Sequence, residues 1–256
     1  MRAFRFLAPV LLLAACGGGS GNEQPSSNDS VPAPDTSAAL PPAQVDWPGY
    51  FEGTWAAMGV TVQLWVHSDS TFVVRTRHGE ADTLPTGAIG TWRVAQVPGG
   101  PAAGLLSVQY EGDPPDHYMR TAKGLVFVDV IGGVDVEQGM VLEKFADEIH
   151  DEVPRMRLKG TFTYMADALS FHPCGAKYSW PCAGGLDAGG EEEGEVLNSM
   201  GTIDLQKAYR KAVKQGGDPW TIEVECSLGM GPAMEGDGAD EYVFIHQVLK
   251  EGVTCP

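Results

Sequence analysis

The sequence predicts a mainly β protein built in two parts, and three observations support this. Between residues 47 and 150, short runs of alternating apolar residues recur at regular spacing, with turns rich in glycine, proline and aspartate between them. Between residues 151 and 256, further strand-like runs surround a single stretch with helical periodicity. The first 46 residues lack both patterns, apart from one short apolar run. We therefore expect the fold to begin near Trp47.

The N-terminus has the features of a secretory signal peptide over residues 1–15. Arg2 and Arg5 precede an apolar run that is shorter than the roughly 20 residues needed to span a bilayer. Its end, "LAAC", resembles the lipobox of bacterial lipoproteins, which implies that Cys16 is acylated and anchors the chain in a membrane. Gly17 in place of Asp favours the outer membrane, facing the periplasm and reached through the lipoprotein sorting machinery. The alternative is an ordinary signal peptide in which Cys16 is incidental.

Residues 16–46 are rich in glycine, serine and proline and contain no long apolar run, so they predict a disordered tether between the lipidated cysteine and the fold. The formal net charge of the chain is −17. A surface this acidic repels nucleic acid, and no nucleic-acid partner is expected. It suits solubility in the periplasm, or attraction to cations or a basic partner.

The first β-rich part, residues 47–150, reads as an antiparallel meander that curls into a small barrel or a curved sheet. Its clearest strand lies at 60–67, where Val60, Val62, Leu64 and Val66 alternate with more polar positions, as in a strand with one buried face. The strands expected after it lie at 71–78, 87–97, 104–110, 116–121 and 124–130.

The second part, residues 151–256, opens with the run "KGTFTYMADALSFHPC" at 159–174. Phe162 and Tyr164 share one parity, whereas Leu169 and Phe171 share the other. A strand with one buried face cannot change parity without an extra residue or a sharp bend. We therefore expect one bent strand with a bulge near Asp167.

The remainder of this part contains an acidic, glycine-rich insertion near 184–201, one helix and two late strands at 220–226 and 241–250. The helix is expected because five apolar residues share one face and Gly216-Gly217 follows them. Those five residues are Leu205, Ala208, Tyr209, Ala212 and Val213. A bent first strand, one helix and late strands predict a five-stranded barrel of OB type.

The chain contains five cysteines. If Cys16 is lipidated, the other four, Cys174, Cys182, Cys226 and Cys255, are expected to form disulfides in the oxidising periplasm. Four cysteines allow three connectivities, and their spacing does not choose between them.

Several runs together resemble the NlpE-type outer-membrane lipoproteins. They are "LKGTFTYMADALSFHPCG", "LQKAYRKA", "PWTIEVEC" and the terminal "GVTCP", with "YFEG", "VTVQLWVHSDSTFVV" and "GTWRV" upstream. The resemblance implies a lipocalin-like half-barrel followed by an OB-like domain. It also implies a Cys174–Cys255 disulfide, which leaves a Cys182–Cys226 bridge as the simplest arrangement of the other pair.

The functions that this resemblance implies are copper resistance and envelope-stress sensing, with activation of the Cpx pathway when maturation or oxidation of the lipoprotein fails. A Cpx-like inner-membrane sensor kinase is the partner it implies. The family's N-terminal Cys-x-x-Cys loop is missing here, where "EGTWAAMGVTVQLW" has no cysteine, so the copper function of that loop is not carried over.

No catalytic motif is present in the sequence. The six histidines are scattered, and there is no phosphate-binding loop or nucleophile elbow. We therefore expect a signalling protein rather than an enzyme, without a cofactor or a metal site. The alternative is a periplasmic binding module that carries a small apolar ligand or a metal ion in the first β-rich part. The tryptophans that are candidates to line a barrel mouth and bind an apolar ligand are Trp55, Trp65, Trp92, Trp180 and Trp220.

Overall fold

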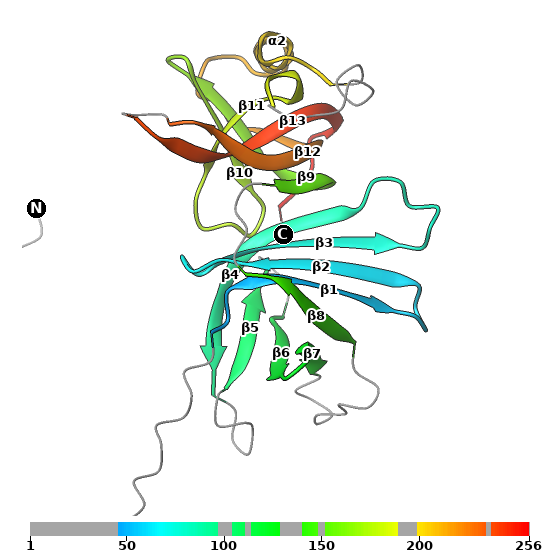
Figure 1. The fold of residues 1–256 in the computed structure, drawn as a ribbon. Helices are drawn as coiled ribbons and strands as arrows, with labels where there is room; N and C mark the ends of the chain where they lie inside the picture. Colours follow the sequence, from blue (N-terminus) through cyan, green and yellow to red (C-terminus); the bar gives the residue numbers. More distant parts are fainter. Residues whose placement is uncertain are drawn as a thin grey trace, which may run out of the picture. The chain divides into compact units, whose positions relative to one another are not determined.

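The computed structural model describes residues 46–96, 104–110, 114–128, 140–147, 152–188, 199–233 and 237–255. All of these residues belong to one structural unit, Pro41–Pro256. Figure 1 shows their strands coloured along the sequence, from blue at β1 to red at β13. The predicted division into domains at 47–150 and 151–256 stays a prediction.

The first β-rich part is an antiparallel meander, as the alternating runs predict. Its strands are β1 (Gly49–Trp55), β2 (Val60–Val66), β3 (Thr71–His78), β4 (Thr86–Ala95), β5 (Leu105–Gln109), β6 (Asp116–Thr121), β7 (Gly124–Val128) and β8 (Val141–Ala146). They lie in the order β4-β3-β2-β1-β8-β7-β6-β5, and β5 also pairs with β4. The meander therefore goes beyond a half-barrel and closes on itself, which leaves neither end strand with a free edge.

The interior of this barrel is filled by the apolar positions of the predicted alternation. Leu64 on β2 is fully buried and packs with Phe51 and Phe72 from the two neighbouring strands. Side chains from other strands of the barrel, such as Leu106 on β5 and Leu142 on β8, complete the same cluster. The described part of the barrel is thus a packed core, as expected for a closed barrel of this size.

The opposite face of β2 is buried as well, which the sequence pattern does not predict. Trp65 is only 3% exposed and belongs, with Val73 and Ile89, to the hydrophobic cluster of the second β-rich part. Arg75 Nε donates to the carbonyl oxygen of Arg155 at 3.0 Å beside this cluster. The prediction of a single buried face was wrong here because packing between the two parts covers the outer face of β2 to β4.

The second part is a five-stranded barrel of OB topology, and the predicted fold class is confirmed. Its elements are β9 (Glu152–Met165), β10 (Ala168–Pro173), β11 (Trp180–Gly184), the 3₁₀ turn η1 (Gly185–Asp187), α2 (Thr202–Ala212), β12 (Trp220–Pro232) and β13 (Ala239–Glu251). The strands lie in the order β10-β11-β13-β12-β9, and β9 closes the ring by pairing with β10. The β11–β13 pair is parallel, and α2 lies between β11 and β12 in the chain.

The helix buries its predicted face at Leu205 and Tyr209, whereas Ala212 is exposed and Val213 lies just after the helix. Leu205 and Tyr209 are buried, and α2 contacts β11 (Figure 1). It ends at Ala212, a few residues before the glycine pair. The predicted acidic insertion begins with η1, and its residues 189–198 lie outside the described part of the chain.

The change of parity in residues 159–174 is produced by a hairpin, and the prediction of a bulged strand was wrong. β9 ends at Met165, Ala166 and Asp167 form a two-residue turn, and β10 begins at Ala168. Across such a turn, an even-numbered residue pairs with an odd-numbered one, as Phe162 does with Phe171. Paired residues face the same side, so both aromatic rings enter the barrel core.

The turn was missed because its sequence lacks the usual signal. Ala166 and Asp167 have φ angles of 49° and 68°, the left-handed conformation of a type I′ turn, which normally selects Asn-Gly. Alanine is disfavoured in this conformation because its Cβ approaches the following carbonyl.

Replacing Ala166 with asparagine is therefore expected to raise the free energy of unfolding by about 1 kcal/mol, because asparagine tolerates a positive φ. Urea unfolding followed by circular dichroism measures the change. The matched control is Ala168→Asn on the neighbouring strand residue, which brings no such relief. An unchanged or lower stability for Ala166→Asn would show that the turn is not strained.

Candidate functional site

A disulfide attaches the C-terminal segment to the OB barrel. Cys174 follows β10, Cys255 follows β13, and their Cα atoms are 5.2 Å apart. The Cys174 amide also donates to the Lys159 carbonyl on β9 at 2.9 Å. This is the pairing that the resemblance implies, and it ties the C-terminal segment to the β9–β10 hairpin.

The second predicted bridge is absent, because Cys182 and Cys226 are both free thiols in the barrel interior. Cys182 pairs with Val243 and Cys226 with Ile245, so β13 lies between the two cysteine-bearing strands. Residues two strands apart are separated by roughly 10 Å, whereas a disulfide needs Cα atoms within about 7 Å. Burial raises the pKa of both thiols, which keeps them protonated and poor nucleophiles.

The predicted lipidation site, Cys16, lies outside the described residues and stays a prediction. Within the described residues, no helix is long and apolar enough to cross a membrane. Among the described residues, no group of three or more histidine, cysteine, aspartate or glutamate side chains is placed to hold a metal ion.

The tryptophans that the binding-module alternative places at a barrel mouth are mostly core residues. Trp65, Trp180 and Trp220 are less than 10% exposed and belong to one hydrophobic cluster. Trp92 packs against the core of the first barrel, and its indole N–H donates to the His67 carbonyl at 2.7 Å.

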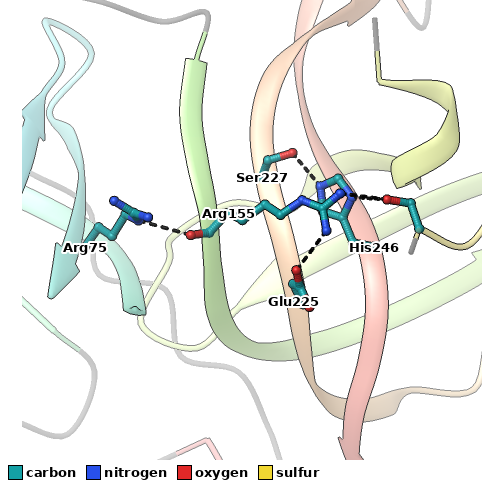
Figure 2. Close-up of polar contacts among 6 residues, drawn as sticks. Arg75, Arg155, Glu225, Ser227 and His246 are labelled. Atoms are coloured by element: carbon teal, nitrogen blue, oxygen red, sulfur yellow. Dashed lines mark hydrogen bonds and ion pairs between the residues drawn. The ribbon is translucent and has the colours of Figure 1, made fainter. Parts of the chain in front are cut away.

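A polar network on the OB barrel is the feature that sequence reasoning missed. Arg155 on β9 forms an ion pair with Glu225 on β12 at 3.0 Å, and its other terminal nitrogen donates to Ser199 Oγ at 2.9 Å. Ser199 Oγ lies 2.8 Å from Nδ1 of His246 on β13, and His246 Nε2 lies 2.8 Å from Ser227 Oγ on β12. Figure 2 shows the Arg155 side chain reaching between Glu225 and His246.

This network connects the two β-rich parts through the backbone of Arg155. The carbonyl oxygen of Arg155 accepts the hydrogen bond from Arg75 on β3 (Figure 2). Arg75 also donates to Gln63, whose amide donates to Tyr50 and to Glu52. Burial, helped by the neighbouring Glu52 carboxylate, raises the pKa of Tyr50 to about 12, so its hydroxyl stays protonated.

His246 is buried with only 1% exposure, and its surroundings keep the ring neutral. Burial, with a further contribution from the Arg155 charge, lowers its pKa to about 4. A neutral imidazole has one donor and one acceptor nitrogen, which matches its two serine partners. Gly185 lies directly against the ring, where an added Cβ would come within 2.1 Å of Nδ1.

The network borders an open groove of about 1160 Å³ that is also lined by Met200, Trp220 and the end of β13. The contact between His246 and Ser227 resembles a base with its nucleophile, but the other ring nitrogen meets a hydroxyl rather than a carboxylate. The arrangement is suited to holding β9, β12, β13 and the segment before α2 together. One sequence signal for it was available, since a histidine inside the apolar run "YVFIH" indicates a buried, hydrogen-bonded ring.

The low pKa of His246 makes stability depend on pH. The unfolded chain binds a proton here below about pH 6.5, whereas the folded protein binds it only below about pH 4. Because the unfolded state then holds more protons, the free energy of unfolding falls as pH drops from 6.5 towards 4, by up to about 1.4 kcal/mol per pH unit.

Urea unfolding at several pH values across this window, for the wild type and for His246→Gln, measures the effect. The wild type is expected to lose more stability per pH unit than the variant. Parallel pH profiles for the two proteins would contradict the assignment.

The second part of the protein is therefore defined by its fold and its disulfide as an OB barrel whose C-terminal segment is held by a disulfide bond. Comparison with protein-family models shows that residues 152–255 match the NlpE C-terminal OB domain. The match to this family model is the one that the resemblance in the sequence predicts.

The two other comparisons give the following results. One solved structure to which the chain is similar is the crystal structure of the Cpx pathway activator NlpE from Escherichia coli, with 16% sequence identity and a TM-score of 0.30. The match covers 78% of this chain and 93% of that chain. No curated protein matches the sequence.

Proposed function

We propose that this protein is a lipid-anchored sensor of the bacterial envelope that reports envelope stress through a Cpx-type pathway, by signalling rather than by catalysis. The NlpE-type C-terminal domain supports the signalling role. The apolar N-terminal run ending in Cys16 supports export and lipid attachment at the outer membrane.

The observation that carries the proposal is the Cys174–Cys255 disulfide. The two cysteines are 81 residues apart in the chain, and the bond holds the last residues against the β9–β10 hairpin. Val253, in the segment that the bond secures, is only 9% exposed. A chain that fails to oxidise loses this attachment, so the state of the bond reports the oxidising capacity of the periplasm.

The proposal is tested with a Cpx-responsive reporter in cells that express the protein at a fixed level. Replacing Cys174 and Cys255 together with serine is expected to raise the reporter signal above that of the wild type. The matched control replaces the free thiols Cys182 and Cys226 with alanine and is expected to leave the signal unchanged. Equal signals from the wild type and the disulfide variant, at equal protein levels, would refute the proposed role.

Lipid attachment is tested separately by mass spectrometry of the N-terminal peptide from membrane-extracted protein. The expected peptide begins at Cys16 and carries acyl chains, and Cys16→Ala is expected to release the protein from the membrane fraction. An unmodified Cys16 in mature protein would refute the anchor while leaving the disulfide experiment independent.

A further inference from the structure

The strained turn at Ala166 and Asp167 forms one wall of a cleft whose purpose the proposed signalling role does not explain. The cleft has a volume of about 340 Å³ and lies between this turn and the C-terminal end of α2. It is lined on the turn side by Tyr164 and Met165, and on the helix side by Tyr209, Arg210, Val213 and Lys214. A volume of this size accommodates a group about as large as one aromatic side chain.

The walls of the cleft are fixed by several contacts. The Tyr164 hydroxyl donates to the Asp167 carboxylate at 3.0 Å, and the Tyr164 carbonyl accepts from the Gly217 amide at 3.0 Å. The rings of Tyr164 and Tyr209 pack edge to face with centroids 6.1 Å apart. A rigid cleft loses little conformational entropy when it binds a ligand, which favours binding.

Two cations at the cleft have no carboxylate partner among the described residues. The Arg210 guanidinium lies 5.4 Å from the centre of the Tyr164 ring and donates only a long hydrogen bond, 3.4 Å, to its hydroxyl. Lys214 takes part in none of the ion pairs of the described residues. By contrast, Lys207, two turns earlier in the chain, is paired with Asp204 at 3.0 Å.

The opposing charges at the cleft are weaker. Among the described residues, Asp167 is the only carboxylate that lines the cleft, and it already accepts a hydrogen bond from the Tyr164 hydroxyl. The C-terminal end of α2 carries a partial negative charge of about half an elementary charge. Two full positive charges therefore exceed one carboxylate and the helix end together.

Walls that combine apolar groups with an excess of cations lacking a carboxylate partner fit an organic anion. We propose that this cleft binds a carboxylate carried on an apolar group, with Arg210 and Lys214 holding the carboxylate and with Tyr164 and Val213 contacting the apolar group. A free aromatic acid and the C-terminal residue of a polypeptide share this chemistry. Arginine on a carboxylate provides charge-assisted hydrogen bonds, and the partly exposed Tyr164 ring provides apolar contact.

The experiment uses full-length protein with ¹³C-labelled methionine methyl groups, because Met165 lines the cleft and is 65% exposed. The probes are N-acetylphenylalanine, its uncharged amide, and a pentapeptide ending in phenylalanine with either a free or an amidated C-terminus. A saturable shift of the Met165 methyl signal is expected for the two probes with a free carboxylate, with a Kd on the order of 1 mM for the acid alone.

Substitutions at the cleft define the expected changes in affinity. Arg210→Gln and Lys214→Gln are each expected to weaken binding about tenfold, whereas the control Lys207→Gln on the same helix leaves it within about twofold. Asp167→Asn is expected to tighten binding, because it removes the opposing charge, and asparagine tolerates the positive φ at this position.

The outcomes separate the two sources of the ligand. Tighter binding of the free-carboxylate peptide than of the acid supports the proposal and identifies a polypeptide C-terminus, whereas binding of the acid alone supports it and identifies a small molecule. The proposal is overturned if neither carboxylate probe gives a saturable shift, if the amides bind equally well, or if Lys207→Gln weakens binding as much as Arg210→Gln does. None of these outcomes depends on the stress-reporter result.

Discussion

Replacing Cys174 and Cys255 together with serine is expected to lower the free energy of unfolding by about 4 kcal/mol. The bond joins residues 81 positions apart, so its loss frees a large loop in the unfolded chain. In the chain-entropy model, a loop of this length accounts for an effect of about that size. The net free energy of unfolding of a typical domain is only about 5–15 kcal/mol, so this loss would bring the protein close to unfolding.

Urea unfolding followed by near-ultraviolet circular dichroism measures this loss. Dithiothreitol is expected to lower the stability of the wild type by a similar amount and to leave the double serine variant unchanged. The double variant is preferred to a single one because air oxidation can join an unpaired Cys174 or Cys255 thiol to Cys182 or Cys226 in a non-native disulfide once the chain unfolds. A loss below about 1 kcal/mol, or a response of the double variant to the reductant, would contradict the assigned role of the bond.

Replacing Arg155 with methionine is expected to cost about 3–5 kcal/mol of unfolding free energy. The Arg155 and Glu225 side chains are each only 18% exposed, so the substitution leaves a largely buried carboxylate without its counter-ion. It also removes a donor from Ser199, which in turn contacts His246. The effect therefore extends beyond one ion pair.

A second substitution distinguishes the loss of the ion pair from the loss of side-chain packing. Adding Glu225→Leu to Arg155→Met is expected to restore most of the stability, because the unpaired charge is then gone. The control is Lys207→Met, which breaks the exposed Lys207–Asp204 pair and is expected to cost less than about 0.5 kcal/mol. If Arg155→Met costs no more than this control, the network does not stabilise the fold.

Much of the fold could be predicted from the sequence because it depends on local periodicity. The alternation around Leu64 defines a strand of the first barrel, and the spacing of Leu205 and Tyr209 defines the buried face of α2. The hairpin at Ala166 and Asp167 was not predicted, because its turn conformation is imposed by the pairing of β9 with β10 rather than by residues that favour it.

The candidate sites were less predictable because they join residues that are distant in the chain. The sequence offered no reason to connect Arg155 with Glu225, or Ser199 with His246, since each pair meets only when particular strands become neighbours. Cys182 and Cys226 were expected to form a disulfide because they are the two cysteines that remain when Cys16 is lipidated and Cys174 is paired with Cys255. They remain thiols because β13 separates their strands.

The sequence by itself determined many elements of this protein: β2 to β7 of the first part, and α2, β12 and β13 of the second. These elements follow from residues close together in the chain, where side-chain period and turn composition act directly, whereas the family of the second part was indicated by the resemblance of its sequence. Only the tertiary structure decided that the first barrel closes, that Trp65 is buried on its outer face, and that Arg155 bridges three segments. Those outcomes depend on which surfaces meet, and burial and hydrogen bonding between distant segments are set by packing rather than by local pattern.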